Sequence, residues 1–127
     1  MTAPPEALDR HFLAVNYLQE GFQSLMIDIL RLFKEHAPVY LTALRNALTQ
    51  GDLQEAVEQA HALKGTAGSA GAALLAQLAG QLEAAALAGE PERCAELLAQ
   101  LDGALGRTIQ AIDEELARQQ DDQDFFS

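Results

Sequence analysis

The chain has 127 residues and a net charge of −11 at pH 7, which is room for one domain that buries roughly two-thirds of its unfolded surface. With 8 Lys and Arg against 19 Asp and Glu, the composition argues against nucleic acid and anionic membrane partners, because both bind mainly through basic side chains. Hydrophobic residues make up 49% of the chain, which indicates a folded globular protein rather than a disordered acidic one.

Several other classes of protein are disfavoured by what the sequence lacks. Cys94 is the single cysteine, so no disulfide can form within the chain. The N-terminal residues do not have the pattern of a signal peptide, and no stretch approaches the roughly 20 apolar residues of a membrane span. We therefore expect a cytoplasmic protein. No glycine-rich nucleotide loop is present, which predicts that the chain carries no ATP site of its own.

The first half of the chain predicts two helices, because Ala and Leu are frequent and β-branched residues are sparse. A first helix is expected over about residues 6 to 18 and is closed by Gly21. A long amphipathic segment follows over about 22 to 49. It contains Pro38, whose ring removes a backbone donor, so one kinked helix is predicted there.

The second half predicts three further helices separated by glycine-containing joints. The third covers about residues 53 to 68, with Asp52 as its N-cap and Glu55 at capping-box spacing. The fourth covers 72 to 88, and the last begins near Pro91 and ends near residue 118. Short loops between helices of similar length favour antiparallel neighbours. The predicted fold is all-α: an antiparallel up-down four-helix bundle with an additional N-terminal helix.

We expect residues 1 to 120 to form this single domain and residues 121 to 127 to form a disordered acidic tail. Cys94 is expected to be partly buried in the packing of the last helix. His11 and His36 are expected to be surface residues without a chemical role.

The third helix carries the residues that suggest chemistry. At about 100° per residue, an apolar stripe faces the core; its members are Leu53, Ala56, Val57, Ala60, Leu63, Ala67 and Ala70. His61, Lys64, Gly65 and Gly68 form a second cluster about 110° away by the same periodicity. This places His61 at the shoulder of the helix, anchored by the bundle but open to water.

The neighbours of His61 fit a histidine that receives an anionic group. Lys64, one turn on, places an ammonium beside anything attached to the imidazole. Gly65 costs about 1 kcal/mol relative to Ala inside a helix, but it leaves no side chain standing over the ring. Gly68 extends this bare strip. An ordinary exposed histidine remains the alternative interpretation of these residues.

A metal site is a second alternative, because Glu58 and His61 have the Glu-x-x-His spacing of di-iron bundles. Those sites need a second such pair, and the matching positions before His11 and His36 hold Leu8 and Phe33. The sequence therefore predicts no metal centre.

The segment AHALKGTAGSAGAALLAQLAGQLEAAALAGE resembles the central part of histidine phosphotransfer domains. The shared pattern is His-x-Leu-Lys-Gly, a later Gly, and spaced Leu residues that lead to a Leu-Glu pair. Its positions here are His61, Leu63, Lys64, Gly65, Gly71, Leu75, Leu78, Leu82 and Glu83. The likeness covers most of residues 22 to 90.

This resemblance implies a phosphorelay intermediate rather than an enzyme. It implies that His61 accepts a phosphoryl group through Nε2 from a receiver-domain aspartyl phosphate and passes it to another receiver. Lys64 would steady the phosphate, and Gly65 would keep the approach open. Glu83 stands where the family often has a Gln or Glu that accepts a hydrogen bond from the histidine Nδ1–H, which fixes the tautomer.

The implied partners are response-regulator receiver domains and a hybrid sensor histidine kinase. The receiver would supply Mg²⁺ and most of the catalytic groups, so this chain needs no cofactor of its own. We expect a monomer with a small docking surface around His61; its expected members are Glu58, Gly68, Phe12, Leu13, Tyr17 and Leu18.

Two other signalling or binding functions are alternatives to this assignment. The dimerisation domain of a histidine kinase also carries a phosphorylated His on a helix, but there an acidic residue typically follows that His and a Pro lies a few residues on. Here Ala62 follows His61. A helical adaptor or inhibitor that acts by binding alone is the other alternative. It has no physical need to combine His61, Lys64 and Gly65.

Overall fold

The computed structural model describes the backbone of residues 5–19 and 21–126 and the side chains as far as residue 120. All regular elements in this part of the chain are helical. They are α1 (Arg10–Leu13), the short π-helix η1 (Ala14–Leu18), α2 (Gln23–Thr49), α3 (Leu53–Ser69), α4 (Ala73–Leu87) and α5 (Pro91–Phe126).

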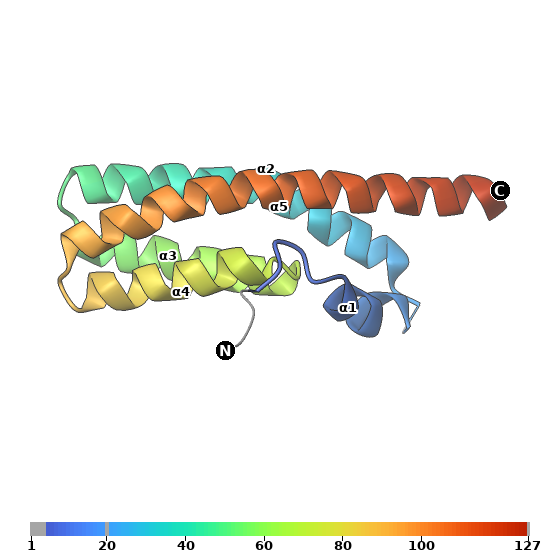
Figure 1. Ribbon diagram of the computed structural model, residues 1–127, viewed down its shortest axis with the longest axis horizontal. Coiled ribbons are helices and arrows are strands. Elements are labelled where there is room, and N and C mark those ends of the chain that lie inside the picture. Colours follow the sequence, from blue (N-terminus) through green and yellow to red (C-terminus); the bar gives the residue numbers. More distant parts are fainter. Residues whose placement is uncertain (1–4, 20, 127) are drawn as a thin grey trace.

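Helices α2 to α5 form an antiparallel four-helix bundle, as predicted. Each packs against two neighbours, α2 against α3 and α5, and α4 against α3 and α5. Figure 1 shows that α2 and α5 are the longer pair and continue beyond the ends of α3 and α4. The short α1 and η1 lie in the space that this difference in length leaves, which gives the additional N-terminal helix of the predicted fold.

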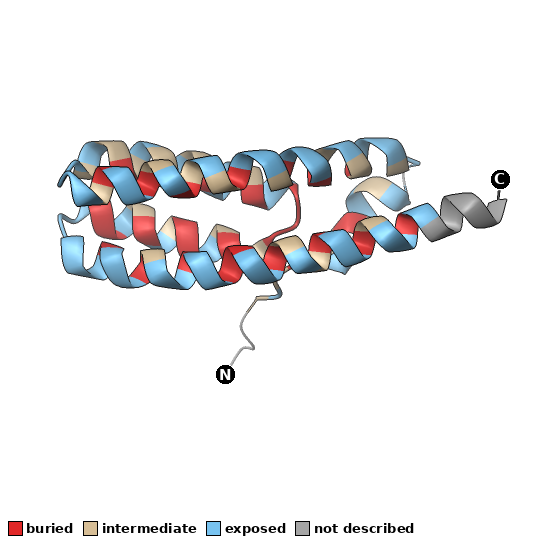
Figure 2. Ribbon diagram, turned by 90° about the horizontal axis from the view of Figure 1, so that it is seen from above, coloured by how far each residue is buried: buried red, intermediate tan, exposed pale blue. Residues whose placement is uncertain are grey.

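The core follows the predicted helical periodicity. The α3 stripe is buried at four positions within the helix, Ala56, Ala60, Leu63 and Ala67, and Cys94 is fully buried rather than partly so. In Figure 2 the buried positions of each bundle helix form a stripe on its inner side. Many of the buried residues are alanines, which allow the helices to approach closely.

Helix α2 passes through Pro38 without a break, so one helix forms rather than two. Figure 1 shows its N-terminal part inclined away from the line of the rest, as expected from a proline ring that crowds the preceding turn. At the start of α3, Asp52 accepts a hydrogen bond from the Glu55 backbone N–H at 3.0 Å. The Glu55 carboxylate accepts from Gln59, so only the Asp52 half of the predicted capping box is present.

The first helix was predicted to start near residue 6, which is wrong. It begins at Arg10, because residues 6 to 9 pair instead with the turn between α3 and α4. The Leu74 N–H donates to the Glu6 carbonyl at 2.9 Å and the Asp9 N–H donates to the Gly71 carbonyl at 2.7 Å. The Asp9 side chain then caps α1 by accepting from the Phe12 N–H at 2.9 Å.

The glycine in that turn is required by its position. Gly71 has φ +73°, and a Cβ there would lie 3.0 Å from the Phe12 ring and 3.4 Å from the Asp9 carbonyl oxygen. A side chain at residue 71 would therefore be strained by the backbone angle and would collide with the N-terminal segment.

The last helix is longer than predicted, since α5 is still helical at Phe126 rather than ending near residue 118. The side chains of residues 121 to 127 lie outside the described part of the chain. The expectation of a disordered acidic tail there stays a prediction. None of the helices in the described part of the chain combines the length and the apolar character that a membrane crossing needs.

Candidate phosphoacceptor site

The candidate site lies on the flank of α3, between the face that packs in the core and the face that points into solvent. Lys64, Gly65 and Gly68 are exposed there. The His61 side chain keeps 71% of its surface in contact with solvent, while Ala60 and Leu63 on either side of it are buried. The helix therefore anchors the backbone of His61 firmly and leaves its imidazole accessible.

Glu83 on α4 connects the two polar side chains of α3. Its Oε2 lies 2.7 Å from the Nδ1 atom of His61, and its Oε1 accepts a hydrogen bond from the Lys64 ammonium at 3.2 Å. The Glu83 side chain is only 16% exposed. A nearly buried carboxylate thus holds two exposed partners, one on each oxygen.

The charge of Glu83 determines which ring nitrogen of His61 is available. Partial burial alone would raise the pKa of Glu83, but the hydrogen bonds from His61 and Lys64 outweigh it and lower that pKa below its usual value. An ionised carboxylate can only accept, so the imidazole carries its proton on Nδ1. The lone pair of the neutral ring is then on Nε2, the nitrogen without a protein partner in the described residues.

Two glycines leave the helix surface beside the imidazole without side chains. A Cβ added at Gly65 or Gly68 would meet no heavy atom within 4 Å, so both positions border open space. Neither glycine is needed for packing, and neither has a positive φ. Their effect is to leave the α3 backbone bare next to His61.

Gly80 on α4 is a site residue that sequence reasoning missed. A Cβ at this position would lie 3.2 Å from the Cδ atom of Lys64, so the glycine makes room for the lysine stem as it reaches towards Glu83. The sequence does contain a signal for it, because Gly80 interrupts a helical segment rich in Ala, as Gly65 does. A glycine inside a helix is less stable than an alanine, so its presence there indicates a need for space.

The N-terminal residues expected at the docking surface are placed differently from one another. Leu13 is 1% exposed and belongs to the core, which corrects the expectation that it faces a partner. Phe12 and Tyr17 are half-buried, and the Tyr17 hydroxyl donates to the Ser69 carbonyl at the end of α3 at 2.8 Å. Leu18, also expected at this surface, is exposed, and so are Val15 and Phe22, which the sequence did not single out.

The remaining polar candidates do not form a second centre. Glu58 is exposed on α3, one turn before His61, and His11 and His36 are exposed elsewhere. Among the side chains that the structure describes, no three His, Cys, Asp or Glu residues come together as a metal site would require. The Glu58-x-x-His61 spacing therefore has no third ligand in this part of the chain.

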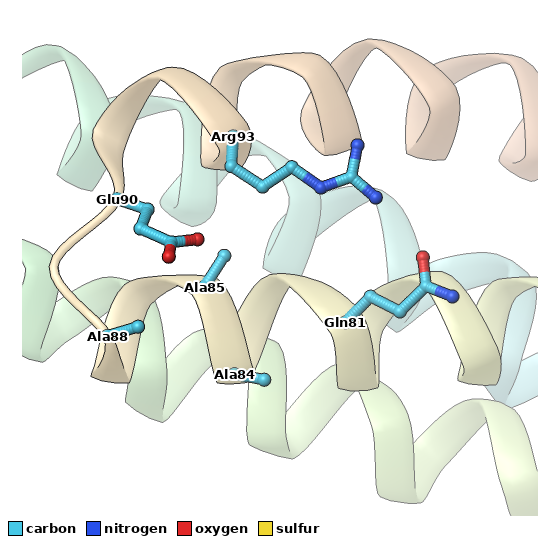
Figure 3. A pocket seen from close by; sticks show the side chains of 6 residues that line it. All are labelled: Gln81, Ala84, Ala85, Ala88, Glu90 and Arg93. Carbon is cyan, nitrogen blue, oxygen red and sulfur yellow. The ribbon is translucent and has the colours of Figure 1, made fainter.

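A separate hollow of about 500 Å³ lies between α4 and α5 at the turn that joins them. Figure 3 shows Gln81, Glu90 and Arg93 around a floor of alanines. On α4 the lining residues Gln81 and Ala85 lie about 160° around the helix from Glu83 by helical periodicity. This hollow therefore does not belong to the His61 site.

Comparisons with known proteins place this arrangement in a family. The Hpt domain family matches residues 28–122. The solved structure of histidine-containing phosphotransfer protein B (HptB) from Pseudomonas aeruginosa PAO1 superimposes with a TM-score of 0.81. It is 32% identical, and the match covers 92% of this chain and 98% of that one.

The chain is also similar to the aerobic respiration control sensor protein ArcB of Escherichia coli (strain K12) and of Shigella flexneri. Each is 37% identical over 67 residues, which is 53% of this chain. The match spans only 9% of the length of ArcB, so the likeness concerns one part of a much longer sensor protein.

The family match covers most of the chain, and the HptB structure shares both its fold and nearly its full length. The chain belongs to the Hpt domain family, whose members are histidine phosphotransfer proteins that act as phosphorelay intermediates and phosphocarriers rather than enzymes.

Proposed function

We propose that His61 is the phosphoacceptor of this chain, which takes a phosphoryl group from the aspartyl phosphate of one receiver domain and donates it to the aspartate of another. The observation that carries this proposal is the exposed imidazole with its Nδ1 atom 2.7 Å from Glu83. A ring held in this way offers the Nε2 lone pair to solvent and to a docked partner.

The transfer step moves one phosphoryl group and leaves the histidine proton in place. The Nε2 lone pair of His61 attacks the phosphorus, an N–P bond forms, and the P–O bond to the receiver aspartate breaks with its electrons leaving on the carboxylate. The Nδ1–H stays in its hydrogen bond to Glu83, whose negative charge stabilises the imidazolium that forms. Onward transfer reverses these changes on the second receiver.

Lys64 and the glycines have complementary roles in this step. The ammonium of Lys64 is already beside the ring through Glu83, so it can offset the charge of an attached phosphoryl group without a large movement. The bare backbone at Gly65 and Gly68 allows the acyl phosphate to approach Nε2 in line.

The catalytic work is divided between the two proteins in this proposal. A neutral imidazole is a sufficient nucleophile at pH 7 and needs no strong base. The receiver would supply the leaving carboxylate and a Mg²⁺ ion that offsets the charge of the phosphoryl oxygens.

The docking surface that we propose runs from His61 along the bare strip of α3 to η1 and the start of α2. Tyr17, bonded to the Ser69 carbonyl, connects η1 to the end of that strip. Val15, Leu18 and Phe22 supply exposed apolar contacts, which suit a transient interface. In this role Glu58 would lie at the edge of the surface, and Leu13 would support it from within the core.

Response-regulator receivers and a hybrid sensor histidine kinase are the proposed partners, in line with the name of the sensor protein ArcB that this chain partly matches. The proposal also includes a monomer in the cytoplasm, where such receivers act. The helical adaptor that binds without phosphotransfer is the competing function, and the experiment below separates the two.

The test is a transfer reaction with a phosphorylated receiver and Mg²⁺. We expect acid-labile, alkali-stable label on this chain, complete loss of that label in His61→Gln, and normal labelling in His36→Gln, a matched exposed histidine on α2. Label that survives His61→Gln would refute the site. Receiver binding without any label would support the adaptor instead.

A further inference from the structure

Glu115 is the only charged side chain that is buried among the described residues, at 3% exposed. Its Oε2 atom accepts from Arg118 Nη2 at 2.7 Å, Arg118 Nε at 3.1 Å and Arg10 Nε at 2.9 Å. Its Oε1 atom accepts from Gln119 Nε2 at 2.9 Å. The phosphotransfer chemistry proposed for His61 makes no use of this carboxylate.

These hydrogen bonds join three separate parts of the fold. Arg10 is in α1, Arg118 and Gln119 are in α5 with Glu115, and Gln23 at the start of α2 donates to the Gln119 side-chain oxygen. Arg118 and Gln119 belong to the same helix as Glu115, so they would stay beside it wherever α1 lay. Arg10 is the donor that ties Glu115 to the N-terminal segment.

The network makes the position of α1 depend on the charge of Glu115. Two guanidinium groups, from Arg10 and Arg118, converge on one carboxylate oxygen. With the negative charge present, both are attracted to it; without it, they repel each other at close range. The Arg10 side chain is 62% exposed, so its guanidinium can turn towards water if this attraction is lost, and α1 then loses its side-chain contact with Glu115.

The segment held by Arg10 carries part of the proposed docking surface. η1 follows α1 directly and bears Val15 and Leu18, and Tyr17 of η1 reaches Ser69. Ser69 lies eight residues from His61 along α3, or about 12 Å. A shift of α1 and η1 would therefore change the distance and angle between the apolar contacts and the phosphoacceptor.

We propose that Glu115 is a positioning residue for receiver docking, because through Arg10 it fixes α1 and η1 against α2 and α5 and so orients the apolar side chains that the receiver contacts. This inference rests on the proposed function of His61. Glu115 lies within the residues 28–122 matched by the family, whereas the α1 and η1 segment that it holds lies before them.

The experiment separates docking from chemistry with two phosphodonors. A phosphorylated receiver must dock, whereas phosphoramidate, a small donor that releases ammonia as its P–N bond breaks, needs only an accessible Nε2. The variants are Arg10→Ala and Glu115→Gln. The matched control is Asp113→Asn, which removes an exposed α5 carboxylate paired with Lys34 of α2 and leaves α1 untouched.

For transfer from the receiver we expect KM to rise about fivefold in Arg10→Ala and about tenfold in Glu115→Gln, the range that loss of a charged hydrogen bond produces. The kcat of that reaction and the rate of labelling by phosphoramidate should remain within about twofold of the parent chain, since neither depends on docking. Asp113→Asn should behave like the parent in both reactions. Amide hydrogen exchange should accelerate in α1 and not in α3.

An unchanged KM in Arg10→Ala would overturn the inference, and so would an equal loss of receiver and phosphoramidate labelling, because that would indicate a general effect on folding. Arg10→Ala keeps the test decisive if Glu115→Gln folds poorly, since Arg118 and Gln119 still satisfy Glu115 in that variant. Absence of transfer from receivers to the parent chain would count against the proposed function, not against the role of Glu115.

Discussion

Glu83 on α4 and Glu115 on α5 each accept hydrogen bonds from side chains. Glu83 leaves a reactive ring accessible to solvent, whereas Glu115 connects helices to one another. Glu83 uses one oxygen for His61 and the other for Lys64, and the free edge of the imidazole faces solvent. Glu115 uses both oxygens for side chains that tie α5 to α1 and α2. None of these partners is a nucleophile, because guanidinium and amide nitrogens have no available lone pair.

The difference shows that the function of a nearly buried carboxylate depends on its partners more than on its own burial. Both groups have a pKa below the usual value because hydrogen bonds outweigh desolvation. At Glu83 the resulting charge orients a nucleophile. At Glu115 the same charge holds a segment in place. The following predictions test this contrast, beginning with the largest expected effect.

The open space at Gly65 beside His61 should be the feature whose loss reduces transfer the most. We expect Gly65→Phe to reduce transfer from a receiver by about 100-fold or more, because a displacement of ~1 Å between reacting atoms already costs about that much. Gly103→Phe is the matched control, since Gly103 is also in a helix and borders open space. Both variants should keep or increase their helix content in circular dichroism. Normal transfer in Gly65→Phe would refute the role of this clearance.

Substitutions at residue 83 should separate the effect of the hydrogen bond to Nδ1 from the effect of the negative charge. We expect Glu83→Ala to slow labelling of His61 by about 10- to 100-fold, because the Nδ1 partner and the charge are both lost. Glu83→Gln keeps an oxygen that can accept from Nδ1 and should lose less. The readout is the rate of labelling by phosphoramidate, which does not require docking. Equal rates in Glu83→Ala and the parent chain would show that the ring needs no orientation.

Acid should affect stability mainly through Glu115. The folded-state pKa of Glu115 is lowered from 4.5, so its stabilisation is complete above that pH and is lost as pH falls through the lower folded value. We expect Glu115→Gln to cost about 1–3 kcal/mol of unfolding free energy at pH 7 and to flatten the acid side of the stability curve. Urea unfolding at a series of pH values measures both. The partners of Glu83 are largely exposed, so the stability curve of Glu83→Gln should stay close to that of the parent chain. An equal flattening in both variants would contradict the proposed difference between Glu83 and Glu115.

The bundle and its core stripe were predictable because each helix is marked locally. Apolar periodicity, glycine at the joints and an Asp N-cap at residue 52 act within a few residues of one another. His61, Lys64 and Gly65 were predictable for the same reason, since one turn of one helix brings them together. The family resemblance added Glu83, which is 22 residues from His61 and lies on another helix.

The N-terminal segment was not predictable in this way because its conformation is decided by distant residues. Residues 6 to 9 have helix-forming neighbours, yet they pair with Gly71 and Leu74. The Glu115 network joins residues 105 positions apart, and no local pattern announces it. Leu13 could not be distinguished from its exposed neighbours, because a helix as short as α1 has too few turns to show a periodicity.

The pairing of residues 6 to 9 with the turn around Gly71 also has a consequence for how the chain acquires its structure. These residues leave the ribosome early, but the groups that hold them are synthesised more than sixty positions later, and Glu115 later still. Loop closure over such separations is slow relative to helix formation. The N-terminal segment should therefore be among the last parts of this protein to fold, after the helical hairpin of α3 and α4 on which it rests.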